Sequence, residues 1–130
     1  MQKSTVLIGA IFIVVAIILG AFGAHALKAV LTEEKLLSFE TGVRYQLIQG
    51  VSLLIIGLNS TSIGFELKLV ERLLIIGTIL FSISIYLLAM ADLLGVSMKW
   101  LGPVTPVGGS LMIIGWFVFI FRLTLQKDNQ

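Results

Sequence analysis

Long runs of apolar residues, separated by short polar segments, dominate the chain. The first run, from Thr5 to Ala24, has no charged residue over about 20 positions. A helix that rises about 1.5 Å per residue needs roughly 20 apolar residues to cross the hydrocarbon core of a bilayer. Three further apolar runs follow. The pattern predicts four transmembrane helices, over residues 5–26, 43–58, 69–94 and 100–122.

The composition also favours a membrane protein. Apolar residues make up 58% of the 130 residues and charged residues 12%, against about 45–50% and about 25% in soluble domains. A small soluble domain could not bury so much apolar surface, because much of its surface stays in contact with water. We therefore expect an all-α integral membrane bundle of four transmembrane helices, formed by residues 1–130 as a single domain.

The charged and reactive residues exclude several classes of site and partner. Nine Lys and Arg residues are spread along the chain and give a net charge of +2. No basic run alternates with aromatic residues, so nucleic acid is not an expected partner. The chain has no cysteine and one histidine, and no span carries a pair of carboxylates. We therefore expect no metal, no cofactor and no acid–base catalytic pair.

The N-terminal segment has one feature of a cleaved signal peptide. Ala24-His25-Ala26 has the small-x-small pattern of a cleavage site. The apolar run before it is longer than the roughly 7–15 residues of a signal core. We expect the first helix to be retained, whereas cleavage would leave three spans.

The connection after the first span predicts a helix of its own. Thr32 followed by Glu33 and Glu34 is typical of a helix N-cap with acidic residues at the positive end of the helix dipole. We expect a short amphipathic interfacial helix there, with Gly42 as a bend into the second span. One continuous helix over residues 33–58 is the alternative.

Small residues recur at intervals that place them on one face of a helix. They lie four residues apart in the first span and seven apart in the third. Small side chains let helix backbones approach closely in lipid, where packing replaces the hydrophobic effect. The residues expected to pack the helices together are Ala16, Gly20, Ala24, Gly50, Gly57, Gly77, Ser84 and Ala91.

The segment that opens the fourth span, residues 100–109, contains two prolines and three glycines. We expect irregular backbone there and a regular helix only from about Gly109. Irregular backbone at membrane depth has to be buried in protein or to face water.

Polar residues collect on the membrane side opposite the termini, because the first and third spans end there and the second and fourth begin there. Ionisable groups at membrane depth are costly, so they are candidates for function. The candidate polar cluster consists of His25, Glu40, Arg44, Gln46, Gln49, Tyr86, Asp92 and Thr105.

Each of these residues also has a structural interpretation. Arg44 either reaches the lipid headgroups or pairs locally with Glu40, or it pairs with a buried partner such as Asp92. Asp92 is either a structural ion-pair partner or part of a site. His25 is either a hydrogen-bonded structural residue or a ligand. In the simplest interpretation the two glutamines form hydrogen bonds between helices.

Basic residues are slightly more frequent on the side of the termini, and the positive-inside rule then favours cytoplasmic termini. Five lie on that side (Lys3, Lys68, Arg72, Arg122 and Lys127) and four on the other (Lys28, Lys35, Arg44 and Lys99).

Five short motifs resemble those of a known family. They are GAFGAHAL at 20–27, TGVRYQ at 41–46, SIYLLA at 84–89, LGPVTPVGG at 101–109 and GW at 115–116. They are similar to the YgdD/YwdK-like family of small four-span membrane proteins of unknown function. The resemblance covers nearly the whole chain and implies a bacterial inner-membrane protein with its first span retained, but no activity. Many members have a histidine where this chain has Gln49, so a mechanism that needs two histidines is not expected.

Three classes of function stay open. The leading hypothesis is a non-catalytic structural or accessory subunit in the lipid bilayer, which packs through its small-residue faces as a homo-oligomer or against a larger membrane partner. The alternative is a small transporter or channel subunit with a polar vestibule on the side opposite the termini, although residues 6–19 and 51–58 offer no polar path. The third is a membrane enzyme that acts on a lipid or a quinone.

Overall fold

The computed structural model describes residues 1–126 and consists of helices joined by short turns. The elements are α1 (Lys3–His25), η1 (Leu27–Ala29), α2 (Glu33–Leu58), α3 (Lys68–Met90), η2 (Lys99–Leu101) and α4 (Val104–Leu125), where η1 and η2 are short 3-10 helices. The four α-helices are long and apolar enough to cross a membrane. No strand occurs within residues 1–126, so the predicted all-α fold with four membrane-spanning helices is confirmed.

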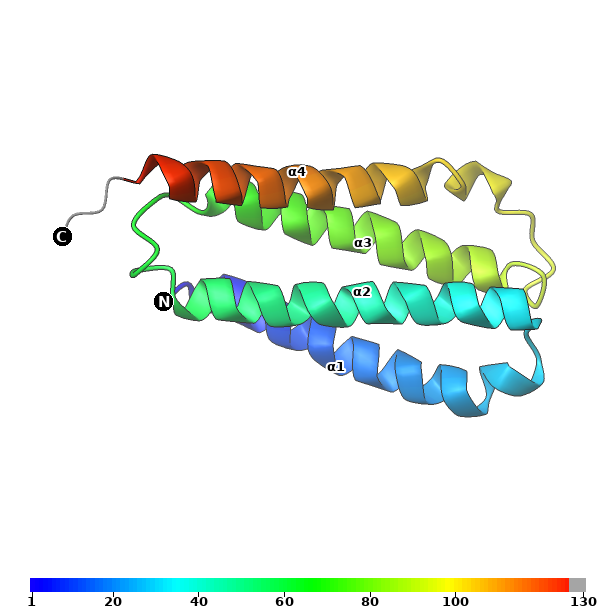
Figure 1. The fold of residues 1–130 in the computed structure, drawn as a ribbon. Helices are drawn as coiled ribbons and strands as arrows, with labels where there is room; N and C mark the ends of the chain where they lie inside the picture. Colours follow the sequence, from blue (N-terminus) through cyan, green and yellow to red (C-terminus); the bar gives the residue numbers. More distant parts are fainter. Residues whose placement is uncertain (127–130) are drawn as a thin grey trace.

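The helices form two antiparallel pairs. α1 packs against α2 and α3 packs against α4, while α2 and α3 join the two pairs. Figure 1 shows the N-terminus, the turn between α2 and α3, and the last turn of α4 at one end of the bundle, which we call the termini end. The connections after α1 and after α3 lie at the opposite end, which we call the distal end.

The residues assigned to a separate interfacial helix are the first turns of α2, so this part of the prediction is wrong and the continuous alternative is confirmed. Thr32 is the N-cap and its hydroxyl accepts a hydrogen bond from the backbone N–H of Lys35 at 3.4 Å. Gly42 is not a bend. A Cβ atom there would lie 2.8 Å from the ring of Tyr86, so the glycine allows α3 to approach α2. A helix that continues into the bilayer also keeps its backbone hydrogen bonds satisfied.

α4 begins at Val104, about five residues before the predicted start, and this boundary is a second correction. Pro103 is the N-cap residue and Pro106 is the third residue of the helix. The first backbone N–H groups of a helix have no acceptor within it, so a proline at these positions removes no helical hydrogen bond. The two prolines therefore start the helix instead of breaking it.

The same glycine contact holds each helix pair together. Between α1 and α2, a Cβ atom at Gly9 would lie 2.7 Å from the carbonyl oxygen of Gly50. Between α3 and α4, a Cβ atom at Gly77 would lie 2.8 Å from the carbonyl oxygen of Gly108. The reverse distances are 3.0 Å for Gly50 and 2.7 Å for Gly108. The obstructing atoms belong to the backbone, so a side chain at any of these positions would push the helices apart.

Two hydrophobic clusters fill the ends of the bundle. At the termini end the buried cluster comprises Leu53, Ile56, Leu67, Val70 and Leu74. At the distal end, buried Leu27, Phe39 and Ala89 pack together. Most of the polar interior lies between these clusters.

Candidate functional site

A hydrogen-bonded network at the centre of the bundle joins three helices. Gln46 of α2 donates from Nε2 to the backbone oxygen of Phe12 in α1 at 3.0 Å. Its amide oxygen accepts a hydrogen bond from the hydroxyl of Tyr86 in α3 at 2.8 Å. Ser82 of α3 donates to the backbone oxygen of Gly42 at 3.0 Å. The nitrogen and the oxygen of the Gln46 amide therefore each have a partner on a neighbouring helix.

A hydroxyl pair joins α3 to α4. The hydroxyl of Ser84 lies 2.7 Å from that of Thr105, and Ser84 also donates to the backbone oxygen of Phe81 at 2.9 Å. Ser84 is buried and Thr105 is half-buried. The structure thus brings three members of the candidate polar cluster to helix–helix contacts, namely Gln46, Tyr86 and Thr105, and the partner of Thr105 is Ser84, a residue expected to pack the helices.

Gln49 is buried, with 5% of its surface exposed, but its amide oxygen has no hydrogen-bond partner within residues 1–126. It lies one helical turn beyond Gln46 and forms part of the wall of an apolar groove between α2, α3 and α4. The two glutamines, which have the same structural interpretation in the sequence analysis, therefore differ in their hydrogen bonding. Gln46 is fully bonded, and Gln49 leaves a buried acceptor unused.

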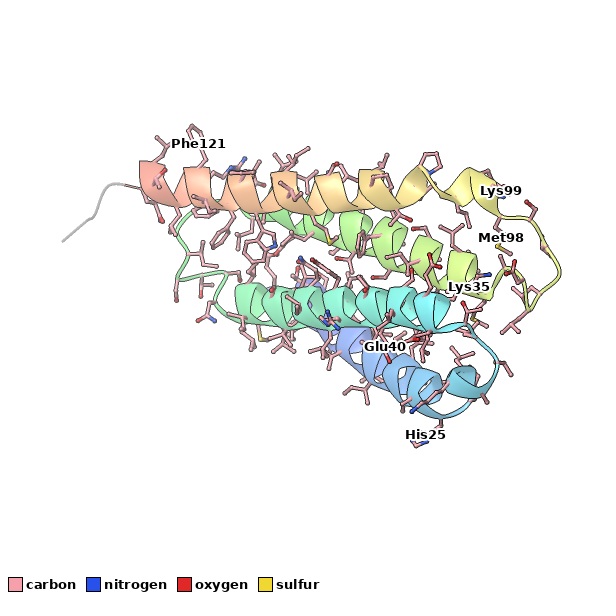
Figure 2. All side chains as sticks on the ribbon, turned by 45° about the vertical axis from the view of Figure 1, so that its right-hand side comes forward. His25, Lys35, Glu40, Met98, Lys99 and Phe121 are labelled. Atoms are coloured by element: carbon pink, nitrogen blue, oxygen red, sulfur yellow. The ribbon has the colours of Figure 1, made fainter. Side chains whose placement is uncertain are left out.

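The charged members of the predicted cluster do not come together. His25, Glu40 and Arg44 are exposed, and Figure 2 shows His25 at the end of α1, pointing away from the other helices. Asp92 forms an ion pair with Lys35 at the distal end, and its side chain is 82% exposed. The hypothesis of an Arg44–Asp92 pair is wrong, because Asp92 pairs with Lys35 in the first turn of α2, whereas Arg44 is exposed.

The residues expected to pack the helices lie mostly at helix contacts. Ala16, Gly50, Gly57, Gly77, Ser84 and Ala91 are buried, and Gly20 is half-buried beside Val43. Ala24 is exposed. The sequence analysis missed Gly9 and Gly108, the partners of Gly50 and Gly77. The available signal was seven-residue spacing, because Gly9 precedes the buried Ala16 by seven residues and Gly108 precedes the buried Gly115 by seven.

A buried carboxylate at the termini end was also missed. Glu71 of α3 is 7% exposed, and with the amide of Gln2 oriented to satisfy both groups, the Gln2 nitrogen donates to the Glu71 carboxylate at 2.7 Å. The same end of the amide lies 3.3 Å from the hydroxyl of Thr5. The available signal was helical spacing, because Glu71 shares a face with the buried Leu67 and Leu74.

Charges in the turn between α2 and α3 stay at the surface. Lys68 Nζ lies 3.0 Å from the Glu66 carboxylate, and the hydrogen bond and charge of this ammonium group lower the pKa of Glu66. Arg122 of α4 donates a hydrogen bond to the backbone oxygen of Glu66 and ties the two pairs together at the termini end. Lys127, which contributed to the expected orientation, lies outside the described residues.

Comparison with known proteins identifies the family. The family described as "Protein of unknown function (DUF423)" matches residues 19–109. This chain belongs to that family. UPF0382 membrane proteins are similar over nearly the whole length. One from Staphylococcus epidermidis is 36% identical over 119 residues, which are 92% of this chain and 93% of the relative. One from Staphylococcus saprophyticus is 35% identical, over 92% and 95% of the two chains. No solved structure matches the chain.

The comparisons and the fold agree at the level of class. The relatives are named as membrane proteins of an uncharacterised family, and the chain has four apolar helices of spanning length. Within residues 1–126, no group of three or more His, Asp or Glu side chains could hold a metal ion. The chain is therefore a polytopic membrane protein of a family of unknown function. Its role has to be inferred from the contacts of its interior residues.

Proposed function

We propose that this protein is a structural or accessory subunit of the bacterial inner (cell) membrane, with both termini in the cytoplasm. Within the family, we assign it to the YgdD/YwdK-like proteins on the motifs of residues 20–27 and 101–109. The observation that carries the proposal is the use of interior polar groups. Gln46, Tyr86, Ser82, Ser84 and Thr105 bond to one another or to backbone atoms of neighbouring helices.

Such groups stabilise helix contacts and leave few reactive side chains in the interior that are free to meet a substrate. Interhelical hydrogen bonds in membranes contribute about 0.6 kcal/mol each on average. A catalytic site needs a nucleophile, acid or base that is free to meet a substrate. Glu71 is the buried carboxylate of the described interior, and the Gln2 amide occupies it.

The outer helices supply surfaces for lateral contact. Each of α1 and α4 packs mainly against one neighbour, so most of its apolar surface faces outward. On α4, the rings of Phe117 and Phe121 lie one turn apart and are 67% and 62% exposed. Figure 2 shows Phe121 pointing away from the bundle. Such a surface fits a second copy of the chain or a larger membrane protein, with lipid where no protein binds.

The test is the mass of the complex that the protein forms when it is extracted from its native membrane in a mild detergent. Native mass spectrometry should find a defined assembly, either a homo-oligomer or a complex with another membrane protein. Phe121→Ala should weaken it, whereas Ile76→Ala, at a residue of the inner helix α3 that is 49% exposed, is the matched truncation and should leave it unchanged. A single chain under all mild conditions, including lipid nanodiscs, would contradict an accessory role.

A transporter or channel subunit is the second candidate, and one feature favours it. A hollow of about 500 Å³ opens at the distal end, with Asp92, Ser97 and Lys99 in its wall. This feature supports a vestibule, although Leu88 and Ala91 form its apolar inner side. Ion or solute flux through liposomes that contain the purified protein, lost in Asp92→Asn, would favour this candidate over the accessory role.

A further inference from the structure

An apolar groove opens on the surface of the bundle between α2, α3 and α4, roughly midway along these helices. Its volume is about 410 Å³, within the roughly 300–1,000 Å³ typical of small-molecule sites. Phe117, at its outer edge, is 67% exposed, so the groove is open to the lipid phase. Its wall is formed mainly by Tyr45, Gln49, Phe81, Met112, Trp116 and Phe117.

The amide of Gln49 is a buried polar group in the wall of an otherwise apolar groove. The residue is 5% exposed, and its buried amide oxygen has no hydrogen-bond partner within residues 1–126. Buried polar groups in native proteins are almost always paired, because an unpaired group loses its bond to water without replacement. An acyl chain of a lipid has no hydrogen to donate. A molecule with a hydroxyl group can donate one, after rotation of the amide toward the groove.

The rest of the wall indicates the chemistry of that molecule. No charged side chain lines the groove, so a charged headgroup would have no counterion at membrane depth. The unpaired partial negative charge of the amide oxygen is complementary to a hydroxyl hydrogen. Four aromatic side chains form much of the remaining surface, and aromatic rings pack well against a flat ring in stacked or edge-to-face geometry.

We propose that this groove binds a neutral, lipid-soluble molecule whose flat aromatic ring carries a hydroxyl group, and that Gln49 accepts the hydrogen bond from that hydroxyl. The ring lies between Phe81 of α3 and Trp116 of α4. The aliphatic tail of the molecule leaves through the open side of the groove into the bilayer. This binding site goes beyond the proposed accessory role, and its test on the purified protein does not depend on a larger assembly.

The second groove of the bundle provides an internal comparison. A groove of about 260 Å³ lies between α1, α2 and α3, and Gln46 is in its wall. The Gln46 amide is already bonded to Phe12 and Tyr86. The oxygen of Gln46 therefore already accepts a hydrogen bond, whereas that of Gln49 accepts none. The same glutamine-to-leucine substitution can be made in both grooves.

The fluorescence of Trp116 reports binding directly. The chain has two tryptophans, and Trp100, which is 72% exposed, lies at the distal end away from the groove. Trp100→Phe leaves Trp116 as the single reporter. The probes are decyl-hydroquinone, its dimethyl ether, which keeps the ring and tail but has no hydroxyl hydrogen, and decyl-cyclohexanediol, which keeps the hydroxyls but has no flat ring. Decyl-hydroquinone is added to the Trp100→Phe protein in detergent micelles. The binding of the other two molecules is measured by their displacement of decyl-hydroquinone, because a saturated diol does not itself quench the indole.

Decyl-hydroquinone should quench Trp116 saturably, and the dimethyl ether should bind at least about tenfold more weakly, because a site that accepts a hydroxyl rejects an analogue without one. Gln49→Leu should lose a similar factor in affinity, whereas Gln46→Leu should retain it. Should Gln46→Leu fail to fold, the comparison of decyl-hydroquinone with its dimethyl ether on the Trp100→Phe protein, which keeps both glutamines, still tests the site. Equal binding of ether and hydroquinone, or unchanged affinity in Gln49→Leu, would overturn the site. Equal binding of the cyclohexanediol would overturn the flat-ring specificity.

Discussion

Adjacent glycines at the start of α4 allow a sharp test of how α3 and α4 are held together. A Cβ atom at Gly108 would lie 2.7 Å from the carbonyl oxygen of Gly77, whereas one at Gly109 would lie 3.6 Å from the ring of Phe81, an ordinary contact. The methyl group of Gly108→Ala therefore has to push two backbones apart. Overpacking of this kind costs about 1–3 kcal/mol, and the better helix propensity of alanine recovers about 0.5–1 kcal/mol. The net loss should be roughly 0–2.5 kcal/mol.

Gly109→Ala carries the same propensity gain without the clash, so it should leave the free energy of unfolding unchanged or raise it by up to about 1 kcal/mol. Thermal or denaturant unfolding in one detergent, followed by far-UV circular dichroism, measures both variants under matched conditions. Shifts of the same sign and size would refute the close backbone contact. Opposite shifts would support it.

Three further predictions follow from the polar contacts. Gln46→Leu removes two interhelical hydrogen bonds and should lower the free energy of unfolding in detergent by about 1–2 kcal/mol; no change would mean that the network does not hold the helices. The ion pair of Lys35 and Asp92 is 30% and 82% exposed, so a double-mutant cycle should give a coupling below about 1 kcal/mol that shrinks in salt, and a larger, salt-independent value would contradict its exposure. Lys68 lowers the pKa of Glu66, so their contact stabilises the fold above the unfolded-state pKa and is lost as pH falls through the folded-state pKa. Carboxyl NMR of Lys68→Met should show that pKa returning toward its usual value, and an unchanged pKa would refute the contact.

The sequence predicts the number and approximate position of the helices because the signal is cumulative. Each span is a long apolar run, and a few misjudged positions do not alter its length enough to hide it. Boundaries depend on single residues and are harder to predict. Pro103 and Pro106 favoured irregular backbone by composition, but their positions at the start of α4 are those at which a helix tolerates proline.

Contacts between helices could be predicted only in part. Helical spacing places Gln46, Gln49 and Gly50 on one face of α2, and this face is buried. Periodicity cannot tell which residue of the neighbouring helix lies opposite, so the contacts of Gly9 with Gly50 and of Gly77 with Gly108 could not be predicted from spacing. For the same reason, the difference between Gln46, which finds Phe12 and Tyr86, and Gln49, which finds no partner, appears only in three dimensions.

The predicted cluster of charged residues was wrong because the distal end of the bundle is wide compared with the reach of a side chain. Sharing a membrane side brings residues to the same end of a bundle, but helices and connections there are wide enough to keep charges apart. His25 and Arg44 face outward, and Asp92 meets Lys35 of the nearest turn. Exposed charges at helix ends reach water or headgroups at little cost, so no strong force gathers them.

Cysteine labelling tests the central claim, that the chain crosses the membrane four times as two paired hairpins. The natural chain has no cysteine, so single cysteines can be introduced at Val30, Ser60 and Ser97, in the three connections between the long helices. A membrane-impermeant maleimide added to intact cells or protoplasts should label Val30→Cys and Ser97→Cys, and should label Ser60→Cys only after the membrane is opened. The reversed pattern would overturn the proposed orientation alone. Labelling of Ser60→Cys and Ser97→Cys from the same side would contradict the four-span fold itself.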